Sequence, residues 1–154
     1  MRAVVQRVKY ASVTVENEVV GKINGGFLVL LGVGKGDSEA DADLLASKIA
    51  KMRVFCDENG KMNLSLNQVG GELLVISQFT LYANCVHGNR PDFFASEGPA
   101  RANELYEYFT EKVKLLSECK TEKGIFGADM KVELLNDGPV TIILDTDELR
   151  KDKK

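Results

Sequence analysis

The sequence predicts an α+β domain in which a curved, mostly antiparallel or mixed β-sheet, barrel-like in form, carries two main helices packed on one side. Three observations favour this class. Short apolar runs separated by turn residues occupy both ends of the chain, and two amphipathic stretches lie between them. The length of 154 residues is that of one ordinary domain.

Residues 2–33 are expected to form strands joined by tight turns. Val13–Val15 alternates apolar and polar side chains, and Asn17-Glu18 and Asn24-Gly25 supply residues typical of turns. Phe27–Leu31 is a short apolar run bounded by glycines, as expected for a strand buried on both faces. We therefore predict that 27–31 lies at the centre of the sheet.

A first helix should begin near Asp37–Asp41, where a capping serine is followed by acidic residues. Leu45, Ile49 and Met52 then recur on one helical face. Beyond this helix, Asn59-Gly60 is a strong turn signal.

The middle of the chain is expected to contain a strand, a loop and a second helix. Residues 72–79 read as a strand with an apolar body and a polar end, whereas 83–98 has no clean period and contains glycine and proline. Pro99 suits the first turn of a helix. The apolar stripe predicted for that helix is Leu105, Phe109, Val113 and Leu116.

The last section, 128–144, reads as two strands separated by Asn136–Pro139, which locally resembles a hairpin turn. The residues after Asp145 are expected to fray.

Composition narrows the function classes. With 20 Lys and Arg against 23 Asp and Glu, the formal net charge of −3 lacks the basic character of a protein that wraps duplex nucleic acid. Cys56, Cys85 and Cys119 form no C-x-x-C pair, which disfavours a disulfide framework and a zinc site. No secretory signal or membrane-length apolar run is visible. We therefore expect a cytoplasmic protein with no metal, no cofactor and no membrane contact.

Two polar clusters stand out as candidate functional sites. Ser77-Gln78-Phe79-Thr80 ends an apolar strand with three hydrogen-bonding side chains and one aromatic ring. Asn136–Thr141 contains the Gly138-Pro139 dipeptide. Taken alone, each cluster has an ordinary interpretation, as a polar strand end and as a turn.

Together with other segments, these clusters carry a resemblance that covers essentially the whole chain. The segments, in order, are Ala3–Val8, Ala11–Val15, Ser77–Leu81, Gly88–Pro91, Phe126–Met130 and Asn136–Thr141. In this order they closely resemble the D-aminoacyl-tRNA deacylase family, also called the D-tyrosyl-tRNA deacylase family.

The resemblance implies a homodimeric cytoplasmic hydrolase that cleaves the ester between a D-amino acid and the terminal ribose of tRNA. Because glycine has no side chain that could clash, we expect glycyl-tRNA to be accepted to some degree as well. The resemblance assigns the catalytic site to Ser77, Gln78, Phe79 and Thr80. It also implies that Gly138 and Pro139, joined by a cis peptide bond, enter the active site of the other subunit and reject L-amino acids.

The same analogy predicts supporting residues and the extent of the domain. The supporting residues are Gln6, Arg7, Met130, Asn136 and Thr141. The deacylase domain should span 1–147, followed by a short basic tail, 148–154.

The chemistry suits a chain with a single histidine. An aminoacyl ester is already activated, and the neighbouring 2′-hydroxyl of the ribose can position or activate water, so the protein need only orient the ester and stabilise an oxyanion. Backbone N–H groups around Phe79 and Thr80 are the candidate donors. Thr80 as a covalent nucleophile is the alternative, although the sequence shows no base to deprotonate it.

Two rival functions remain open at this point. The first is a small esterase with Ser77 or Thr80 as nucleophile and His87 as base. The second is a non-catalytic module that binds RNA ends or nucleotides.

The candidate contacts for a single-stranded acceptor end of tRNA are Arg90, Phe79, Phe93 and Phe94.

Overall fold

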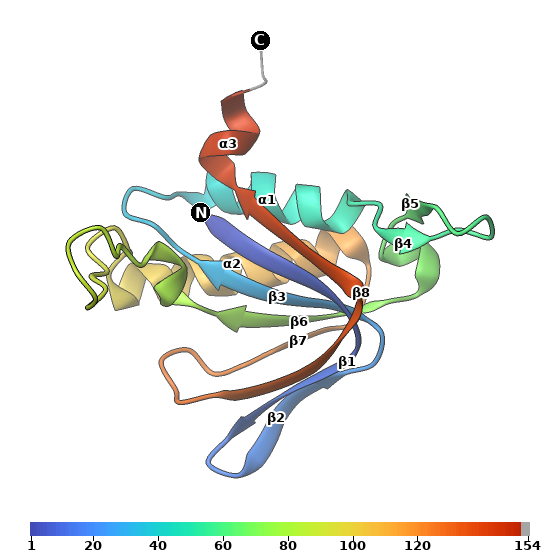
Figure 1. Ribbon diagram of the computed structural model, residues 1–154, viewed down its shortest axis with the longest axis horizontal. Coiled ribbons are helices and arrows are strands. Elements are labelled where there is room, and N and C mark those ends of the chain that lie inside the picture. Colours follow the sequence, from blue (N-terminus) through green and yellow to red (C-terminus); the bar gives the residue numbers. More distant parts are fainter. Residues whose placement is uncertain (152–154) are drawn as a thin grey trace.

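One long strand, β1 (Arg2–Val15), organises the sheet in this computed structural model, which describes residues 1–151 (Figure 1). Along one edge, β1 pairs antiparallel with β3 (Gly26–Gly32) and then with β2 (Glu18–Ile23). Along its other edge it pairs antiparallel with β8 (Lys131–Asp145). The first and last long strands of the chain therefore lie side by side.

The strand β3 is central and largely buried, which confirms the prediction for 27–31. It runs parallel to β6 (Glu72–Ser77), and β6 runs parallel to β7 (Thr121–Lys123). The strand order is β2-β1-β3-β6-β7, with β8 added along β1. The sheet is mixed and strongly curved, so that it is nearly closed and barrel-like, as predicted (Figure 1).

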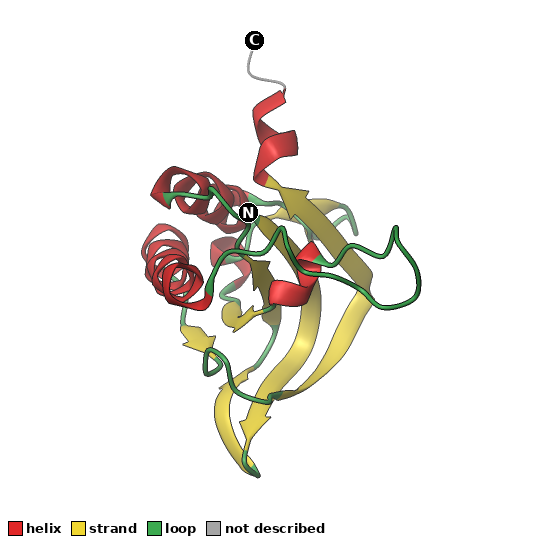
Figure 2. Cartoon of the chain, turned by 90° about the vertical axis from the view of Figure 1, so that its left-hand side faces the viewer, coloured by secondary structure: helices red, strands yellow, loops and turns green. Residues whose placement is uncertain are grey.

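Two helices, α1 (Glu39–Lys51) and α2 (Pro99–Ser117), cover one side of this sheet (Figure 2). The main core lies between them and the sheet and includes Leu45, Phe27 and Phe109. A second cluster fills the concave side of the sheet; its buried members are Val8, Ala11, Val13, Ile23, Leu28, Leu74 and Ile76, with Met130, Val132 and Leu134 packed against them. The curvature of the sheet thus encloses apolar side chains on both faces.

The remaining elements are short. They are β4 (Phe55–Cys56), β5 (Met62–Leu64), the 3₁₀ helices η1 (Asn67–Val69) and η2 (Phe79–Tyr82), and α3 (Thr146–Lys151). The predicted turn at Asn59-Gly60 joins β4 to β5.

Two predictions in the middle of the chain need correction. The strand β6 ends at Ser77 rather than at residue 79, because the chain turns into η2 there. On α2, Leu105, Phe109 and Val113 are buried as expected, but Leu116 is exposed. In the last turn the buried position is that of Ser117 instead, one residue further along the helix.

The end of the chain also differs from the prediction. Residues 131–145 do not fold back on themselves, because both halves of β8 pair in the same direction with β1. The residues after Asp145 form α3, whose Thr146 is buried and whose Arg150 pairs with Asp41. Of the predicted basic tail, Lys153 and Lys154 lie outside the described residues.

No helix within residues 1–151 is both long enough and apolar enough to cross a membrane.

The start of α1 depends on a buried carboxylate. The Asp41 side chain accepts a hydrogen bond from the Ser38 N–H, 2.8 Å away, and forms an ion pair with Arg150. Burial by itself would raise the pKa of Asp41, but the hydrogen bond from Ser38 and the charge of Arg150 together hold that pKa below its usual value.

This carboxylate should make stability depend on pH. Because its pKa is lower in the folded chain, the stability it contributes is present above the unfolded pKa, about 3.9, and is lost as the pH falls through the folded pKa. We expect the free energy of unfolding to fall less steeply below about pH 4 for Asp41→Asn than for the wild type. Urea denaturation at a series of pH values measures this, and parallel curves for the two proteins would contradict it.

Candidate active site

A cleft of about 570 Å³ opens at the carboxyl end of β6. The end of β6 and the start of η2 form one wall, the start of α2 forms a second, and the segment 126–132 forms a third. The lining residues are Val33, Ile76, Ser77, Gln78, Phe79, Phe93, Ser96, Glu97, Pro99, Ala102, Phe126, Gly127, Ala128, Asp129, Met130 and Val132. Three of the four predicted catalytic residues, Ser77 to Phe79, therefore share one cleft with Met130.

Strand pairing positions this wall of the cleft. Because β6 runs parallel to β3, Ser77 lies beside Leu31, and the Gln78 N–H donates to the Leu31 carbonyl oxygen at 2.8 Å. The turn η2 then crosses over the end of β3 at Gly32. A Cβ atom at Gly32 would lie 3.1 Å from the Gln78 carbonyl oxygen, so this close approach favours glycine.

The hydroxyl of Thr80 is exposed and does not line the cleft. Its Oγ1 accepts a hydrogen bond from the side-chain amide of Gln78, which is not a base. His87 is exposed in the 83–98 loop, and within residues 1–151 no hydrogen bond connects it to Ser77 or Thr80. The geometry therefore does not favour the esterase hypothesis.

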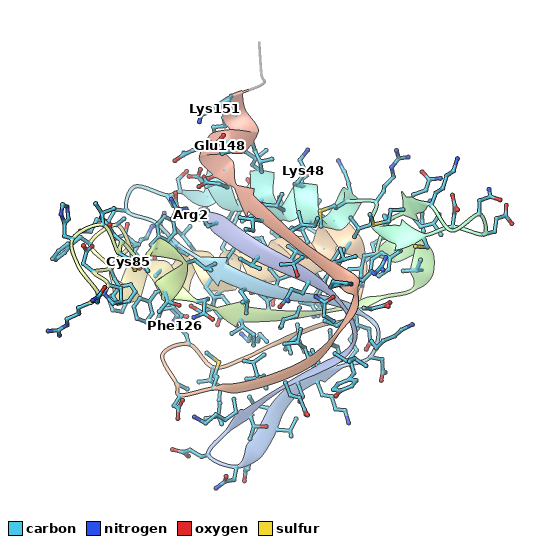
Figure 3. The ribbon with its side chains drawn as sticks, in the orientation of Figure 1. Arg2, Lys48, Cys85, Phe126, Glu148 and Lys151 are labelled. Atoms are coloured by element: carbon cyan, nitrogen blue, oxygen red, sulfur yellow. The ribbon has the colours of Figure 1, made fainter. Side chains whose placement is uncertain are left out.

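Aromatic rings border the cleft. The ring of Phe79 is 55% exposed and meets the ring of Phe93 edge-on, with centroids 5.0 Å apart and planes inclined at 69°. Phe126, from the opposite wall, is labelled in Figure 3 and packs on the buried ring of Tyr106. Exposed ring faces of this kind can stack on a nucleobase.

The charged residues that line the cleft are Glu97 and Asp129, and none of its lining residues within the described chain is Lys or Arg. Such a cleft suits an uncharged or cationic group better than a phosphate. Glu97 was not among the residues predicted from the sequence; its position just before the first turn of α2 is the one signal that could have indicated it.

The second polar cluster forms a bulge in β8. Gln6 of β1 stands opposite Thr141 and Val8 opposite Asn136, so that residues 137–140 all face the single residue Arg7. Gly138 and Pro139 are exposed at the tip of this bulge, and the peptide bond between them is cis.

Arg7 lies beneath the bulge and is almost buried, with 11% of its side chain exposed. Its Nε donates to the Asp137 carbonyl oxygen at 2.9 Å, and its Nη1 donates to the Val54 carbonyl oxygen at 2.6 Å. A Cβ atom at Gly138 would lie 3.1 Å from the guanidinium. Arg7 thus ties the bulge to the segment after α1.

The base of the bulge is closed by Asn136. Its Oδ1 accepts from the Val140 N–H at 2.8 Å, and its Nδ2 donates to the Val140 carbonyl oxygen at 3.1 Å. Its Nδ2 also donates to Thr141 Oγ1, at 3.3 Å, as does Nε2 of Gln6. Arg7, Gln6, Asn136 and Thr141 therefore all contact the bulge or its base.

The two polar clusters lie apart within one chain. Ser77 is level with Ala3 of β1, whereas the bulge is level with Arg7 and three strands away across the sheet. Measured along the curved sheet, strand spacings put the two about 20 Å apart. Met130 lies with the Ser77 cluster and is separated from Gly138 and Pro139 of its own chain.

Comparisons with known proteins agree over almost the whole length. A sequence model described as D-Tyr-tRNA(Tyr) deacylase matches residues 4–145. A D-aminoacyl-tRNA deacylase of Thermosipho melanesiensis is 55% identical over 146 residues, which cover 95% of this chain and 97% of the relative. A protein of the same name from Dictyoglomus turgidum is 54% identical over 154 residues, covering 100% of this chain and 98% of the relative.

Solved structures share the fold. The c-Myc DNA Unwinding Element Binding Protein superimposes with a TM-score of 0.86 at 42% identity, covering 94% of this chain and 98% of the other. A probable eukaryotic D-amino acid tRNA deacylase gives a TM-score of 0.78 at 15% identity, covering 93% and 97%; this likeness concerns the fold alone.

The closure of the bulge by Asn136 can be tested by amide hydrogen exchange. Asn136→Ala removes the acceptor of the Val140 N–H, and one net hydrogen bond of about 1 kcal/mol corresponds to a roughly fivefold faster exchange at Val140. Asn136→Asp is the matched control, because its carboxylate still accepts this bond. Equal protection of Val140 in Asn136→Ala and the wild type would contradict the assignment.

Proposed function

This chain belongs to the D-Tyr-tRNA(Tyr) deacylase family, and from that premise we propose that it hydrolyses the ester bond of D-aminoacyl-tRNA, releasing a free D-amino acid and tRNA. The observation that carries the proposal is the cleft at the end of β6, where Ser77, Gln78 and Phe79 stand together and no Lys, Arg or His is among the described residues that line it. A cytoplasmic location follows from such a substrate.

The mechanism that fits this cleft is hydrolysis assisted by the substrate. The ribose 2′-hydroxyl next to the ester positions or activates the attacking water, and the protein stabilises the oxyanion. Phe79 and Thr80 begin the η2 turn, where the first N–H groups have no partner inside the turn. These two N–H groups are the proposed oxyanion donors, and Ser77 and Gln78 hold ribose or water.

The cleft is suited to the terminal nucleoside rather than to the phosphates before it. Phe79 and Phe93 offer ring surface for the terminal adenine, whereas Glu97 and Asp129 repel phosphate groups. With a net charge of −3, the protein should contact only the single-stranded acceptor end of the tRNA and bind it weakly.

Selection against L-amino acids is assigned to Gly138 and Pro139 of a second copy of the chain. Within one chain the bulge is about 20 Å from the cleft along the curved sheet, by strand spacings, and we propose that the bulge of a partner subunit enters this cleft instead. The outer edge of β8 supports a homodimer, because Leu135 and Ile143 expose 50% and 75% of their surface beside an edge that no other described strand covers.

Rejection works through the shape of this backbone. If the carbonyl oxygens of Gly138 and Pro139 hold the substrate amino group, the side chain of an L-amino acid must project into the backbone and is excluded. Glycine has no side chain to exclude. The filter therefore admits D-amino acids and glycine.

A deacylation time course on three substrates tests the function. With catalytic amounts of protein we expect rapid loss of D-tyrosyl-tRNA, no acceleration for L-tyrosyl-tRNA, and measurable hydrolysis of glycyl-tRNA. Loss of both tyrosyl esters would instead indicate a general esterase, and loss of neither a binding module. Stability of glycyl-tRNA alone would contradict a purely steric filter.

The role of Thr80 is tested separately. Thr80→Ala should retain most of the activity on D-tyrosyl-tRNA, whereas removal of a covalent nucleophile costs about 10⁶-fold in kcat in a well-studied hydrolase. His87→Ala is the matched control for the esterase alternative and should also remain active. Complete loss of activity in Thr80→Ala with intact folding and tRNA binding would restore the nucleophile hypothesis.

A further inference from the structure

The side chain of Arg2, labelled in Figure 3, connects three parts of the chain: the start of β1, the end of β8 and the η2 turn. Its Nε donates to Asp145 Oδ2 at 3.0 Å, at the end of β8. Its Nη1 donates to the Leu81 carbonyl oxygen at 3.0 Å, within the η2 turn. Its guanidinium carbon also lies 4.4 Å from the ring centroid of Tyr82, the last residue of that turn.

Asp145 is held in its ionised form, which the ion pair with Arg2 requires. Burial by itself would raise its pKa, but hydrogen bonds from the Asp147 N–H and from Arg2 keep the pKa of Asp145 below its usual value. The carboxylate is therefore charged at neutral pH and fixes the planar guanidinium in one orientation.

The ring of Tyr82 is also packed closely against two glycines at the end of β3. A Cβ atom at Gly34 would lie 2.7 Å from its Cζ and 2.8 Å from its hydroxyl oxygen, and a Cβ atom at Gly32 would lie 3.3 Å from its Cδ2. Ordinary contacts of a Cβ atom are longer than this. The side chain of any larger residue at position 32 or 34 would therefore overlap with the Tyr82 ring.

These contacts leave the η2 turn little freedom. Arg2 fixes the direction of the Leu81 carbonyl group, and Tyr82 is confined by the guanidinium and the glycine backbone. The turn is short, with only four residues from Phe79 to Tyr82, so the peptide planes at its start follow those at its end.

We infer that Arg2 and Tyr82 are positioning residues for deacylation: they hold η2 so that the N–H groups of Phe79 and Thr80 face the ester carbonyl. This inference rests on the proposed function. Neither side chain lines the cleft, so they act through the turn and not by touching the substrate. Because 42% of the Arg2 side chain is exposed, its ion pair should add little to stability, and its effect should fall on the rate.

The experiment measures kcat and KM on D-tyrosyl-tRNA together with thermal unfolding. Arg2→Gln and Tyr82→Leu should each lower kcat by about ten- to a hundredfold, as displaced catalytic groups do, with KM close to wild type. The melting temperature should stay close to wild type in Arg2→Gln and fall in Tyr82→Leu, which loses a packed ring. Arg2→Lys should recover only part of the rate, since an ammonium cannot form both hydrogen bonds and stack on the ring. The control is Lys123→Gln, which breaks a similarly exposed ion pair, with Glu107, and should keep wild-type kinetics.

A second measurement approaches Tyr82 from the glycine side and leaves Arg2 intact. Gly34→Ala should lower kcat like Arg2→Gln, because the added methyl group displaces the ring. In a Tyr82→Leu background, Gly34→Ala should cause no further loss, since the ring it would strike is gone. If Arg2→Gln does not fold, the comparison of Gly34→Ala in the wild-type and Tyr82→Leu backgrounds still tests the inference.

The outcomes are distinct. Wild-type kcat in both Arg2→Gln and Gly34→Ala would overturn the inference while leaving deacylation intact. Equal additional losses from Gly34→Ala with and without the Tyr82 ring would also overturn it. A wild-type protein that fails to hydrolyse D-tyrosyl-tRNA would instead refute the proposed function.

Discussion

The simultaneous pairing of β1 with β3 on one edge and β8 on the other is the constraint on which the rest of the structure depends. Through β3 it sets the level at which β6 ends and therefore where Ser77 and Gln78 open into the cleft. Through β8 it sets the level of the bulge opposite Arg7. A shift of one residue in either ladder would move these groups to the opposite face of the sheet.

In the proposed mechanism, the cleft orients a reactive ester and supplies no nucleophile of its own. Its polar groups are two serines, an amide, two carboxylates and backbone N–H groups, and none of the described residues that line it is a histidine. Such groups contribute by holding the reactants in place and by stabilising negative charge where it develops. The precision of the η2 turn then matters more than the acidity of any side chain, which is why contacts behind the turn, at Arg2 and Tyr82, gain importance.

Several features were accessible from local sequence because their signals are local. The buried strand 27–31, the start of α1 after a capping serine, and Pro99 in the first turn of α2 all follow from periodicity and terminal residues. Errors arose where long-range contacts outweighed these signals. The pattern at Asn136–Pro139 resembles a hairpin turn, but the segments on both sides of it pair with β1 as one strand. The helix α3 forms because Thr146 bonds to the N-terminal amino group and Arg150 pairs with Asp41 of α1.

The sequence by itself determined the class of fold, the order of most elements and the two motifs that place the chain in its family, because hydrophobic periodicity and motif spacing are properties of neighbouring residues. Only the tertiary structure decided that the two motifs lie apart in one chain, on strands that are three positions away from each other in the sheet. It alone brought Arg2, Leu81 and Asp145 together. These arrangements depend on which strands pair and in what register, and that choice is made by contacts between residues far apart in the chain.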